Sequence, residues 1–567
     1  MKTVKAIFKW TLLSLAALIL FMVVWFLIVA VDHPPEVSDL SALKTERIQT
    51  GENTYTLGNN WIRKSENGLW EMYIEGEPFE RGVAAGILTR ELLYYQENAF
   101  VEQIRVLVPS DNYLRFLKYF LAWFNRNLDK NIPEEYKLEI YGTSFSCSPE
   151  FNFIGSGYQR QLNYHAAHDI GHALQGLNMV GCTSFSVWDG KSADSSLIVA
   201  RNFDFFAGKK FAENKIVCFI KPSAGHRFMM VTWAGMMGVV SGMNEKGLTV
   251  TINASKSSVP GQAAAPVSLV AREILQYAAN IKEAEEIASR RKMFVSESIL
   301  IGSAADGRSA IIEKTPRKQD LFMPDGNRIV CANHFQGSTF SNDRLNTENI
   351  NGSDSKYRFD RMNELLDLDT VIDVNEAASI LRNRYGLGNA NLGMGNPLAL
   401  NQLIAHHSVI FKPSERRAWV STPPWQLGKF SEYNMNTVFN LRAGEINSNT
   451  EIYEIHSSIP ADTFLLSHDY LSFLKYKKLE EELRNYRSDE LPLPQGFAEE
   501  YTGSNPMLWS VWSDLGDYYF KMKDFSNAYK YYQAALSKEV AGNDIRTDLE
   551  RVSAESLKNS GNAEKRD

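Results

Sequence analysis

From Cys182 onward the chain is divided into short strand-like runs separated by turns, and this pattern limits the fold more than any other feature. The runs alternate apolar and polar residues or are wholly apolar, and they occur at Thr183–Trp188, Leu197–Phe203, Lys215–Ile220, Phe228–Trp233 and Leu248–Asn253. Turn-forming residues such as Asp189-Gly190 lie between them. The pattern predicts antiparallel sheet.

Helical patterns and further strands follow these first strands. The helical patterns cover Val267–Arg290 and Arg358–Leu366, and the further strands are Ser298–Gly302, Ala310–Lys314, Arg328–Ala332 and Ser408–Phe411. Strands in runs with helices in pairs are typical of helices stacked on packed antiparallel sheets. We therefore expect an α+β fold.

The N-terminal part contains a stretch without any charge, from Trp10 to Val31. A helix over this stretch would be about 33 Å long, enough to cross a hydrocarbon core of about 30 Å. Three lysines precede the stretch and Asp32 follows it, so the positive-inside rule places the N-terminus in the cytoplasm and the rest of the chain on the extracytoplasmic side, periplasmic or extracellular. We predict a transmembrane signal anchor. A cleaved signal peptide is the alternative, although its apolar core is shorter, about 7 to 15 residues.

Charge and cysteine content exclude two further classes of protein. The chain has 60 Lys and Arg against 67 Asp and Glu, a net charge of -7, and no basic run that could follow a phosphate backbone, so we expect no nucleic-acid partner. Only four cysteines occur in 567 residues, too few for a disulfide scaffold in an exported chain. We interpret Cys218 and Cys331 as buried apolar residues.

The composition divides the chain into four expected regions. They are a cytoplasmic stub with the anchor (1–33), a largely helical propeptide segment with one strand at Trp70–Gly76 (34–181), a catalytic region (182–467) and a helical tail (468–567).

Within the tail, residues 505–538 follow the W-x2-L-G-x2-Y…A…A pattern of a tetratricopeptide repeat, beginning at Trp512. A single repeat cannot bury its own apolar face. We therefore favour a helical hairpin that packs on the main body, with contact to another protein through this TPR-like hairpin as the alternative.

The Gly181-Cys182 pair opens the strand-rich region, and Arg201 and Asp204 lie at the end of the next strand. A hairpin of these two strands would bring a guanidinium and a carboxylate beside the thiol, where the positive charge favours the thiolate over its reference pKa of about 8.5. If the Gly181-Cys182 bond is cut, the new α-amino group can accept the thiol proton and act as the base. Such a nucleophile needs no histidine.

Five motifs in this order carry a resemblance. They are Gly181-Cys182-Thr183-Ser184, Arg201-Asn202-Phe203-Asp204-Phe205, Gly247-Leu248-Thr249-Val250-Thr251-Ile252-Asn253, Ala332-Asn333-His334 and Ser355-Lys356-Tyr357-Arg358. Over about Leu69 to Pro424 the chain resembles the penicillin acyltransferase and choloylglycine hydrolase families of N-terminal-nucleophile (Ntn) hydrolases. The resemblance implies an αββα sandwich, in which two antiparallel sheets lie between helix layers.

The resemblance also implies a role for each motif residue. Cys182 would be the nucleophile and, through its amine, the base; Asp204 would hold that amine and Arg201 would lie against the thiol. Asn253 would donate its side-chain amide to the oxyanion, a contact worth about 3 kcal/mol of barrier. Asn333 would orient the amine or the substrate, and Arg358 would complete the polar network, with Arg361 competing for that place. No cofactor or metal is required.

The position of Cys182 makes internal self-cleavage a requirement of this interpretation. Choloylglycine hydrolases expose their cysteine by losing little more than an initiator methionine, whereas here a long segment precedes it, as in the acyltransferase precursors. Arg201 is more similar to the hydrolases, so hydrolysis and transfer to an amine acceptor both stay open. Water is plentiful outside the membrane, which favours hydrolysis of an N-acyl amide or a lipid-like acyl compound.

Two interpretations compete with this one. His165, His168 and His172 share one face of a predicted helix, and His168-Asp169 is similar to the signature dyad of HD-type metal-dependent phosphohydrolases. Such a site needs another histidine from an earlier helix, and none lies between Pro34 and Tyr164. The other alternative is an inactive binding protein that recruits partners through the tail.

Overall fold

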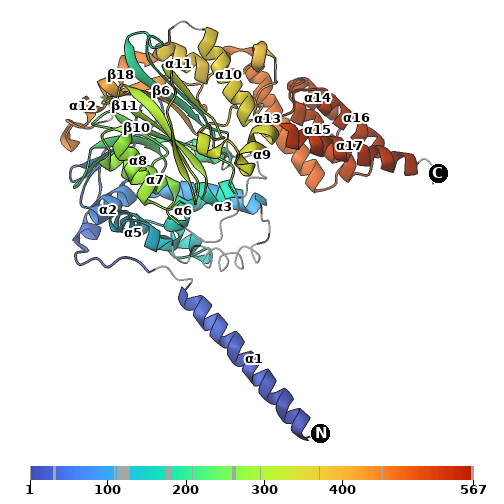
Figure 1. The fold of residues 1–567 in the computed structure, drawn as a ribbon, viewed down its shortest axis with the longest axis horizontal. Coiled ribbons are helices and arrows are strands. Elements are labelled where there is room, and N and C mark those ends of the chain that lie inside the picture. The colour runs from blue at the N-terminus through green and yellow to red at the C-terminus, as the bar shows by residue number, and fades with distance from the viewer. Residues whose placement is uncertain are drawn as a thin grey trace.

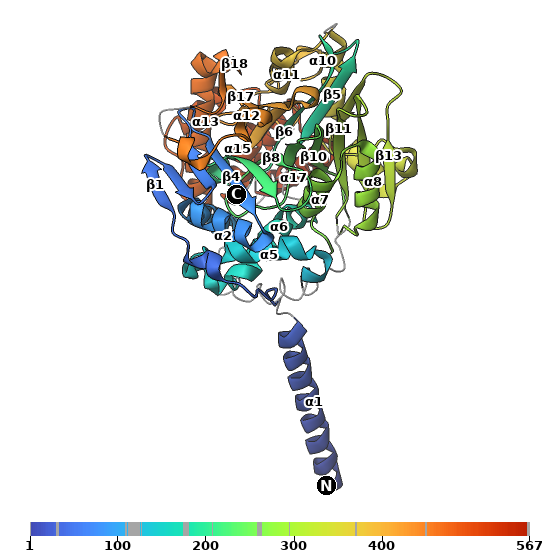
Figure 2. The same ribbon diagram turned by 90° about the vertical axis from the view of Figure 1, so that its left-hand side faces the viewer.

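The computed structural model describes residues 2–29, 33–107, 110, 125, 128–173, 181–206, 208–257, 264–293, 295–368, 371–447 and 451–563. Within these residues the strands form two sheets that lie face to face, and helices cover the outer side of each sheet (Figures 1 and 2). The expected mixture of helices with two packed sheets is confirmed.

The first sheet has eleven described strands. Their order is β1 (Ile48–Gly51), β2 (Thr54–Leu57), β3 (Asn60–Lys64), β4 (Trp70–Gly76), β7 (Ile216–Pro222), β8 (Phe228–Thr232), β9 (Ser241–Asn244), β10 (Leu248–Ala254), β11 (Glu297–Ser303), β12 (Arg308–Lys314) and β13 (Gln319–Phe322). Neighbouring strands are antiparallel except β4 and β7, which run parallel over all seven residues of each strand.

The second sheet has seven described strands, all antiparallel to their neighbours. Their order is β14 (Arg328–Cys331), β5 (Thr183–Asp189), β6 (Ser195–Phe203), β15 (His407–Lys412), β16 (Arg417–Ser421), β17 (Phe430–Asn434) and β18 (Glu454–Ile459). β5 and β6 are the first two strands predicted after Cys182, and they pair with each other as a hairpin.

Strand alternation assigns side chains to the three apolar layers. Val199 of β6 packs between the two sheets with Phe219 of β7 and Val409 of β15. Its neighbours Ile198 and Ala200 point the other way, toward the helices on the second sheet. Both faces of the central strands are therefore buried, which explains why these strands are almost wholly apolar.

Each sheet has its own helix layer. α2 (Pro78–Leu88), α3 (Arg90–Leu107), α7 (Val267–Tyr277) and α8 (Ile281–Arg290) contribute to the core on the first sheet, and α10 (Ser355–Leu368) and α11 (Val374–Leu381) cover the second. The other α-helices that the structure describes in the body are α5 (Glu134–Ser144), α6 (Gly157–Ala173), α9 (Arg344–Gly352) and α12 (Met435–Val438).

Two segments differ from the sequence prediction. Residues 34–181 contain four strands, β1 to β4, besides their helices, and these strands extend the first sheet. The helical pattern over Val267–Arg290 divides into two helices, because Asn280 caps a new helix start by accepting a hydrogen bond from the backbone N–H of Glu283.

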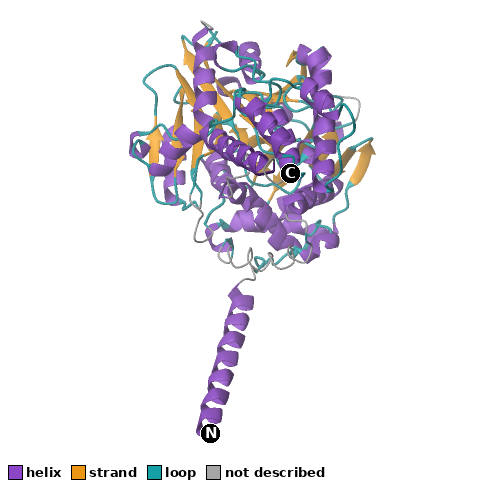
Figure 3. Cartoon of the chain, turned by 90° about the vertical axis from the view of Figure 1, so that its right-hand side faces the viewer, coloured by secondary structure: helices purple, strands orange, loops and turns teal. Residues whose placement is uncertain are grey.

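The N-terminal helix α1 (Lys2–Val29) projects away from the body in the three ribbon views (Figures 1, 2 and 3). Its stretch Phe8–Trp25 has a mean hydropathy of 2.0 and is not buried against other residues. The helix is therefore long and apolar enough to cross a membrane, a criterion that a signal sequence also meets.

The C-terminal tail is helical, and its elements lie together at one side of the body (Figures 1 and 3). They are α13 (His468–Ser488), α14 (Phe497–Ser504), α15 (Trp509–Lys521), α16 (Phe525–Leu536) and α17 (Asn543–Ala563). Gly516 of α15 lies against the ring of Tyr532 on α16, where a Cβ would approach to 2.6 Å. The tail shares a core with Leu403 and Leu427 of the body, while its likeness to a tetratricopeptide repeat stays a prediction.

Candidate active site

The β5–β6 hairpin places Cys182 beside two of the predicted site residues. Ser184 pairs with Arg201 in the sheet, and the backbone N–H of Gly181 donates to the carbonyl oxygen of Asp204 at 3.0 Å. The end of one strand and the start of the other therefore meet at the Gly181-Cys182 bond.

The Cys182 thiol is completely buried, with Sγ 3.9 Å from the backbone oxygen of Asp204. Burial raises the pKa of this thiol to about 11, the negative charges of Asp204 and Glu297 act in the same direction, and Arg201 opposes them. In the continuous chain the thiol is therefore protonated at neutral pH.

Arg201 connects the two sheets next to this thiol. Its guanidinium donates to the carbonyl oxygens of Val240 at 2.6 Å and Ile252 at 2.8 Å, and to the Ser241 hydroxyl at 3.0 Å. It also lies over the Phe203 ring, 4.7 Å from its centroid. Burial lowers the pKa of Arg201, while the nearby Cys182 and Asp204 favour its charged form. Neutral acceptors thus hold the guanidinium without neutralising its charge.

Asp204 is also completely buried, and neither of its carboxylate oxygens has a hydrogen-bond partner among the described residues. Burial raises the pKa of Asp204 to about 7, although Arg358 and Arg201 act to lower it. An unpartnered buried carboxylate is rare in folded proteins, because the group loses its hydration without compensation.

Arg358 on α10 holds the backbone of the candidate nucleophile. Its guanidinium donates to the Cys182 carbonyl oxygen at 2.9 Å, to Thr183 Oγ1 at 2.7 Å and to Asn333 Oδ1 at 2.8 Å. Arg361, the competitor in the sequence, instead pairs with Glu364 at 2.8 Å and bonds side chains of another segment. The structure places Arg358, and not Arg361, at Cys182.

The two predicted asparagines link strands around this centre. Asn253 donates its amide to the Cys331 carbonyl oxygen at 3.0 Å and accepts from the Ser184 hydroxyl at 2.8 Å. Asn333 donates to the Ala254 carbonyl oxygen at 2.8 Å while it accepts from Arg358. The oxyanion role expected for Asn253 stays a prediction, since its amide bonds the protein itself here.

Two buried residues near the site were missed by sequence reasoning. Gln402 donates its side-chain amide to the Gly181 carbonyl oxygen at 2.8 Å, from an irregular segment that precedes β15. Glu297, at the start of β11, is buried with neither carboxylate oxygen hydrogen-bonded among the described residues, and burial raises its pKa well above the ordinary value. No motif or periodicity marks either position.

The histidine cluster on α6 has a structural explanation in its described part. His165 is buried, with Nδ1 2.7 Å from the Gln161 carbonyl oxygen, and its Nε2 accepts from the Met237 N–H at 2.9 Å. Asp169 accepts from the Val267 N–H at 2.9 Å. The side chains of His168 and His172 lie outside the described residues. Among the described side chains, no group of three His, Cys, Asp or Glu is arranged to hold a metal ion.

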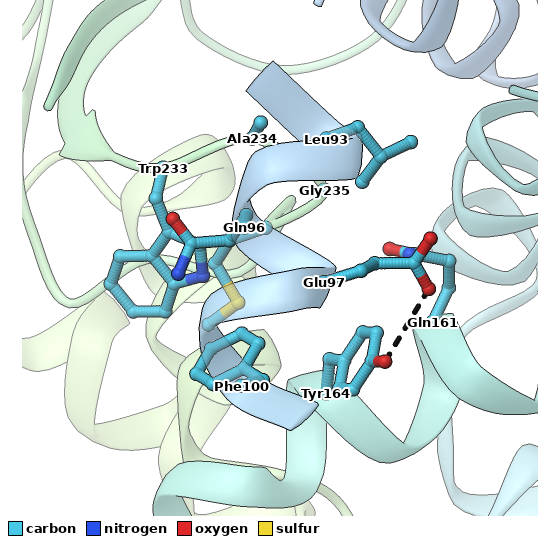
Figure 4. Close-up of a pocket in the computed structure, with 10 residues that line it drawn as sticks. Leu93, Gln96, Glu97, Phe100, Gln161, Tyr164, Trp233, Ala234 and Gly235 are labelled. Carbon is cyan, nitrogen blue, oxygen red and sulfur yellow. Dashed lines mark hydrogen bonds between the residues drawn. The ribbon is translucent and has the colours of Figure 1, made fainter. Parts of the chain in front are cut away.

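A small cavity lies next to the aromatic residues of the site, between α3, α6 and the loop after β8 (Figure 4). It has room for about one water molecule. Trp233, which forms one wall, stacks on Phe203 with ring centroids 6.4 Å apart. Cys182 belongs to the same apolar core as these rings.

Comparisons with known proteins agree with the motif pattern. Residues 188–422 match the family model of acyl-coenzyme A:6-aminopenicillanic acid acyl-transferase, a match that begins six residues after Cys182. An uncharacterized protein of Archaeoglobus fulgidus is 23% identical over 358 residues, which cover 57% of this chain and 59% of that protein.

Two solved structures are also similar in part. The Caenorhabditis elegans N-acylethanolamine-hydrolyzing acid amidase ortholog is 16% identical, with a TM-score of 0.30, over 41% of this chain and 93% of its own. A mutant conjugated bile acid hydrolase from Clostridium perfringens is 14% identical, with a TM-score of 0.32, over 48% of this chain and 99% of its own. The resemblance to the penicillin acyltransferase family is confirmed by the family match.

Proposed function

We propose, from the premise that residues 188–422 match the acyltransferase family, that the protein is an Ntn enzyme that acts on amide bonds. It would cut its own Gly181-Cys182 bond and then use the Cys182 thiol to remove the acyl group of an N-acyl amide. Water would release that group from the enzyme. A cofactor or a metal has no part in these steps.

The unpartnered carboxylate of Asp204 is the observation that supports this proposal most. The buried site surrounds this carboxylate with two arginines, but neither donates a hydrogen bond to it among the described residues. Cleavage would create an α-ammonium group on Cys182, a residue whose thiol already interacts electrostatically with Asp204. The new cation would supply the hydrogen-bond donors and the charge that the carboxylate lacks.

The same cation changes the chemistry of the thiol. An α-amino group has a reference pKa near 8, so a fraction of it is neutral at neutral pH, and this neutral amine can accept the proton that Cys182 Sγ releases. Arg201 stabilises the resulting thiolate by charge. The thiolate would attack the substrate carbonyl carbon, and the amine would return the proton to the leaving nitrogen.

The aromatic core around Cys182 supports an apolar acyl group. Phe203, Phe205, Phe211 and Trp233 all share the apolar core that contains the thiol. A fatty or aromatic acyl chain fits such surroundings better than a charged one. We infer a lipid-like N-acyl amide as the substrate class, presented to a body that α1 holds on the extracytoplasmic side of a membrane.

The first experiment compares the purified full-length protein with Cys182→Ala by intact mass and N-terminal sequencing. The proposal expects a fragment that begins Cys-Thr-Ser-Phe in the wild type and no fragment in the variant. A single uncut chain in both samples would overturn self-activation. N-acyl amides would then be tested on the cleaved protein only.

Acyl transfer to an amine acceptor is the second candidate, and the description of the matching family supports it. Both reactions share the thioester at Cys182 and differ only in what attacks it. Adding an amine during turnover separates them, because transfer yields a new amide at the expense of the free acid. If the free acid is the sole product at every amine concentration, the reaction is hydrolysis and not acyl transfer.

A further inference from the structure

The carbonyl group of Gly181 belongs to the bond that the proposed function requires to be cut, and it is held by a side chain from elsewhere in the fold. Gln402 Nε2 donates to this oxygen at 2.8 Å. Gln402 is 3% exposed, so water competes little for its amide. The donor is therefore fixed in place before any reaction begins.

The contact depends on the absence of a side chain at position 181. A Cβ on Gly181 would lie 2.5 Å from Gln402 Nε2 and 2.8 Å from its Oε1. Such distances are too short for any real Cβ, so a larger residue would push the amide away from the carbonyl. Glycine at this position and glutamine at 402 thus fit each other.

The neighbouring carbonyl is held independently. Arg358 donates to the oxygen of Cys182 at 2.9 Å, so the two carbonyls that flank the thiol each have their own donor. Asn253, the donor expected from the motif pattern, bonds Cys331 and Ser184 instead. Among the described contacts of the cleavage site, Gln402 is the group that bonds the carbonyl of the bond to be cut.

The chemistry of cleavage places negative charge on that oxygen. The Cys182 sulfur bonds the Gly181 carbonyl carbon, and the C=O electron pair moves to oxygen while the thiol proton passes to the Cys182 nitrogen. The electron pair then returns to re-form the C=O bond as the C–N bond breaks, which leaves a thioester on sulfur and a free amine on Cys182. Water adds to the thioester and the C–S bond breaks, which leaves a Gly181 carboxylate and a free thiol.

We propose that Gln402 is the oxyanion donor of this self-cleavage and that it restricts residue 181 to glycine. The inference rests on the proposed function, because it concerns the same bond. A donor already aimed at the oxygen stabilises the tetrahedral state without rearrangement. Loss of one such donor slows a reaction by about 10²–10³-fold.

The test follows cleavage of the newly synthesised full-length chain by intact mass over time. We expect Gln402→Ala and Gly181→Ala to be slower by about 10²–10³-fold than the wild type. Gln426→Ala is the matched control, a buried glutamine in the loop between β16 and β17, and it should cleave at the wild-type rate. Wild-type rates for Gln402→Ala would overturn the inference, whereas an uncut wild type would overturn the proposed function instead.

Gln402→Glu separates an oxyanion donor from a merely structural residue. An ionised carboxylate cannot donate, but its protonated form can. The rate of this variant, divided by the wild-type rate at the same pH, should therefore rise as the pH falls. A ratio that does not change with pH would contradict the donor role. Equal unfolding temperatures of Cys182→Ala with and without Gln402→Ala would show that the fold is kept, and a slower rate then counts as a chemical effect.

Discussion

Two carboxylates, Glu139 and Asp204, are equally buried but differ in whether the protein donates hydrogen bonds to them. Glu139 Oε2 accepts from Arg81 at 3.0 Å and from Arg272 at 3.2 Å. Burial acts to raise the pKa of Glu139, but the two arginines outweigh it and the pKa is lowered. The Asp204 carboxylate has arginines near it and no hydrogen bond among the described residues, and its pKa is raised.

The difference shows how one fold uses buried charge for two purposes. A carboxylate bonded by two guanidinium groups links α2, α5 and α7, and loss of one partner leaves a buried charge unpaired. A carboxylate left without a bond makes the folded chain less stable and ready to bind a cation. Mutation of Glu139 should therefore change the free energy of unfolding, and mutation of Asp204 should change the rates of cleavage and turnover.

The largest expected effect is on activity, at the unpartnered site. Asp204→Asn keeps the shape of the side chain and removes its charge, so the Cys182 amine would lose its counter-ion. We expect cleavage and turnover to fall by about 10²–10⁴-fold, with an unfolding temperature equal to or above that of the wild type. Cleavage is followed by intact mass and unfolding by circular dichroism. Normal activity in this variant would remove Asp204 from the mechanism.

The next effect is on stability, at the paired site. Glu139→Gln leaves two buried guanidinium groups without their anion and should lower the free energy of unfolding by about 3–5 kcal/mol. Urea unfolding measures it. Glu286→Gln, at an exposed i,i+4 contact with Lys282, is the control and should change it by less than about 1 kcal/mol. A small loss for Glu139→Gln would mean that the two sites do not differ in this way.

A pH titration compares the folded and the unfolded states of Asp204 directly. Its pKa rises from 3.8 to about 7 on folding, so the folded chain binds the proton more tightly. The stability from this group is full below about pH 4 and is lost as the pH rises through about 7, a total of about 4 kcal/mol.

The uncut Cys182→Ala protein, with and without Asp204→Asn, isolates this contribution in urea unfolding at several pH values. The difference between the two proteins should grow between pH 4 and pH 7 in favour of the Asn variant. Glu139 has a lowered pKa, so its contribution is instead lost as the pH falls. Parallel curves for the two proteins would contradict the raised pKa of Asp204.

The smallest effect concerns the thiols. Cys218 is as buried as Cys182 and lies in the same apolar core, but no step of the proposed cleavage involves it. Cys218→Ala should cost about 1 kcal/mol of unfolding free energy and leave cleavage unchanged. Cleavage is measured by intact mass at equal folded fraction. Reduced cleavage in this variant would mean that Cys218 also takes part in the self-cleavage assigned to Cys182.

Sequence reasoning predicted the parts of the site that lie at strand ends. The β5–β6 pairing follows from alternation and turn residues, and it brings Arg201 and Asp204 to Cys182. The sequence did not decide whether Arg358 or Arg361 lies at Cys182, because helical spacing does not say which residue faces the sheet. The structure resolves that choice through the bond to the Cys182 carbonyl.

The missed features depend on contacts distant in the chain. Gln402 reaches Gly181 across more than two hundred residues, from a segment with no periodic pattern. β1 is short and mostly exposed, so it lacks the apolar alternation that marks a strand. β4 was predicted as a strand, but its partner β7 could not be predicted, since the pair joins two regions that the sequence separates.

The parallel pairing of β4 with β7 gives the proposed cleavage a consequence for assembly. After the cut, α1 and β4 would belong to one polypeptide and Cys182 and β7 to another, and the two strands would stay paired in register over seven residues each. The product would be an obligate heterodimer made from a single gene product. The pairing of β4 with β7 would then take the place of the peptide bond that links the catalytic chain to α1. The chain that begins at Cys182 could dissociate from α1 only if the first sheet separated between these two strands.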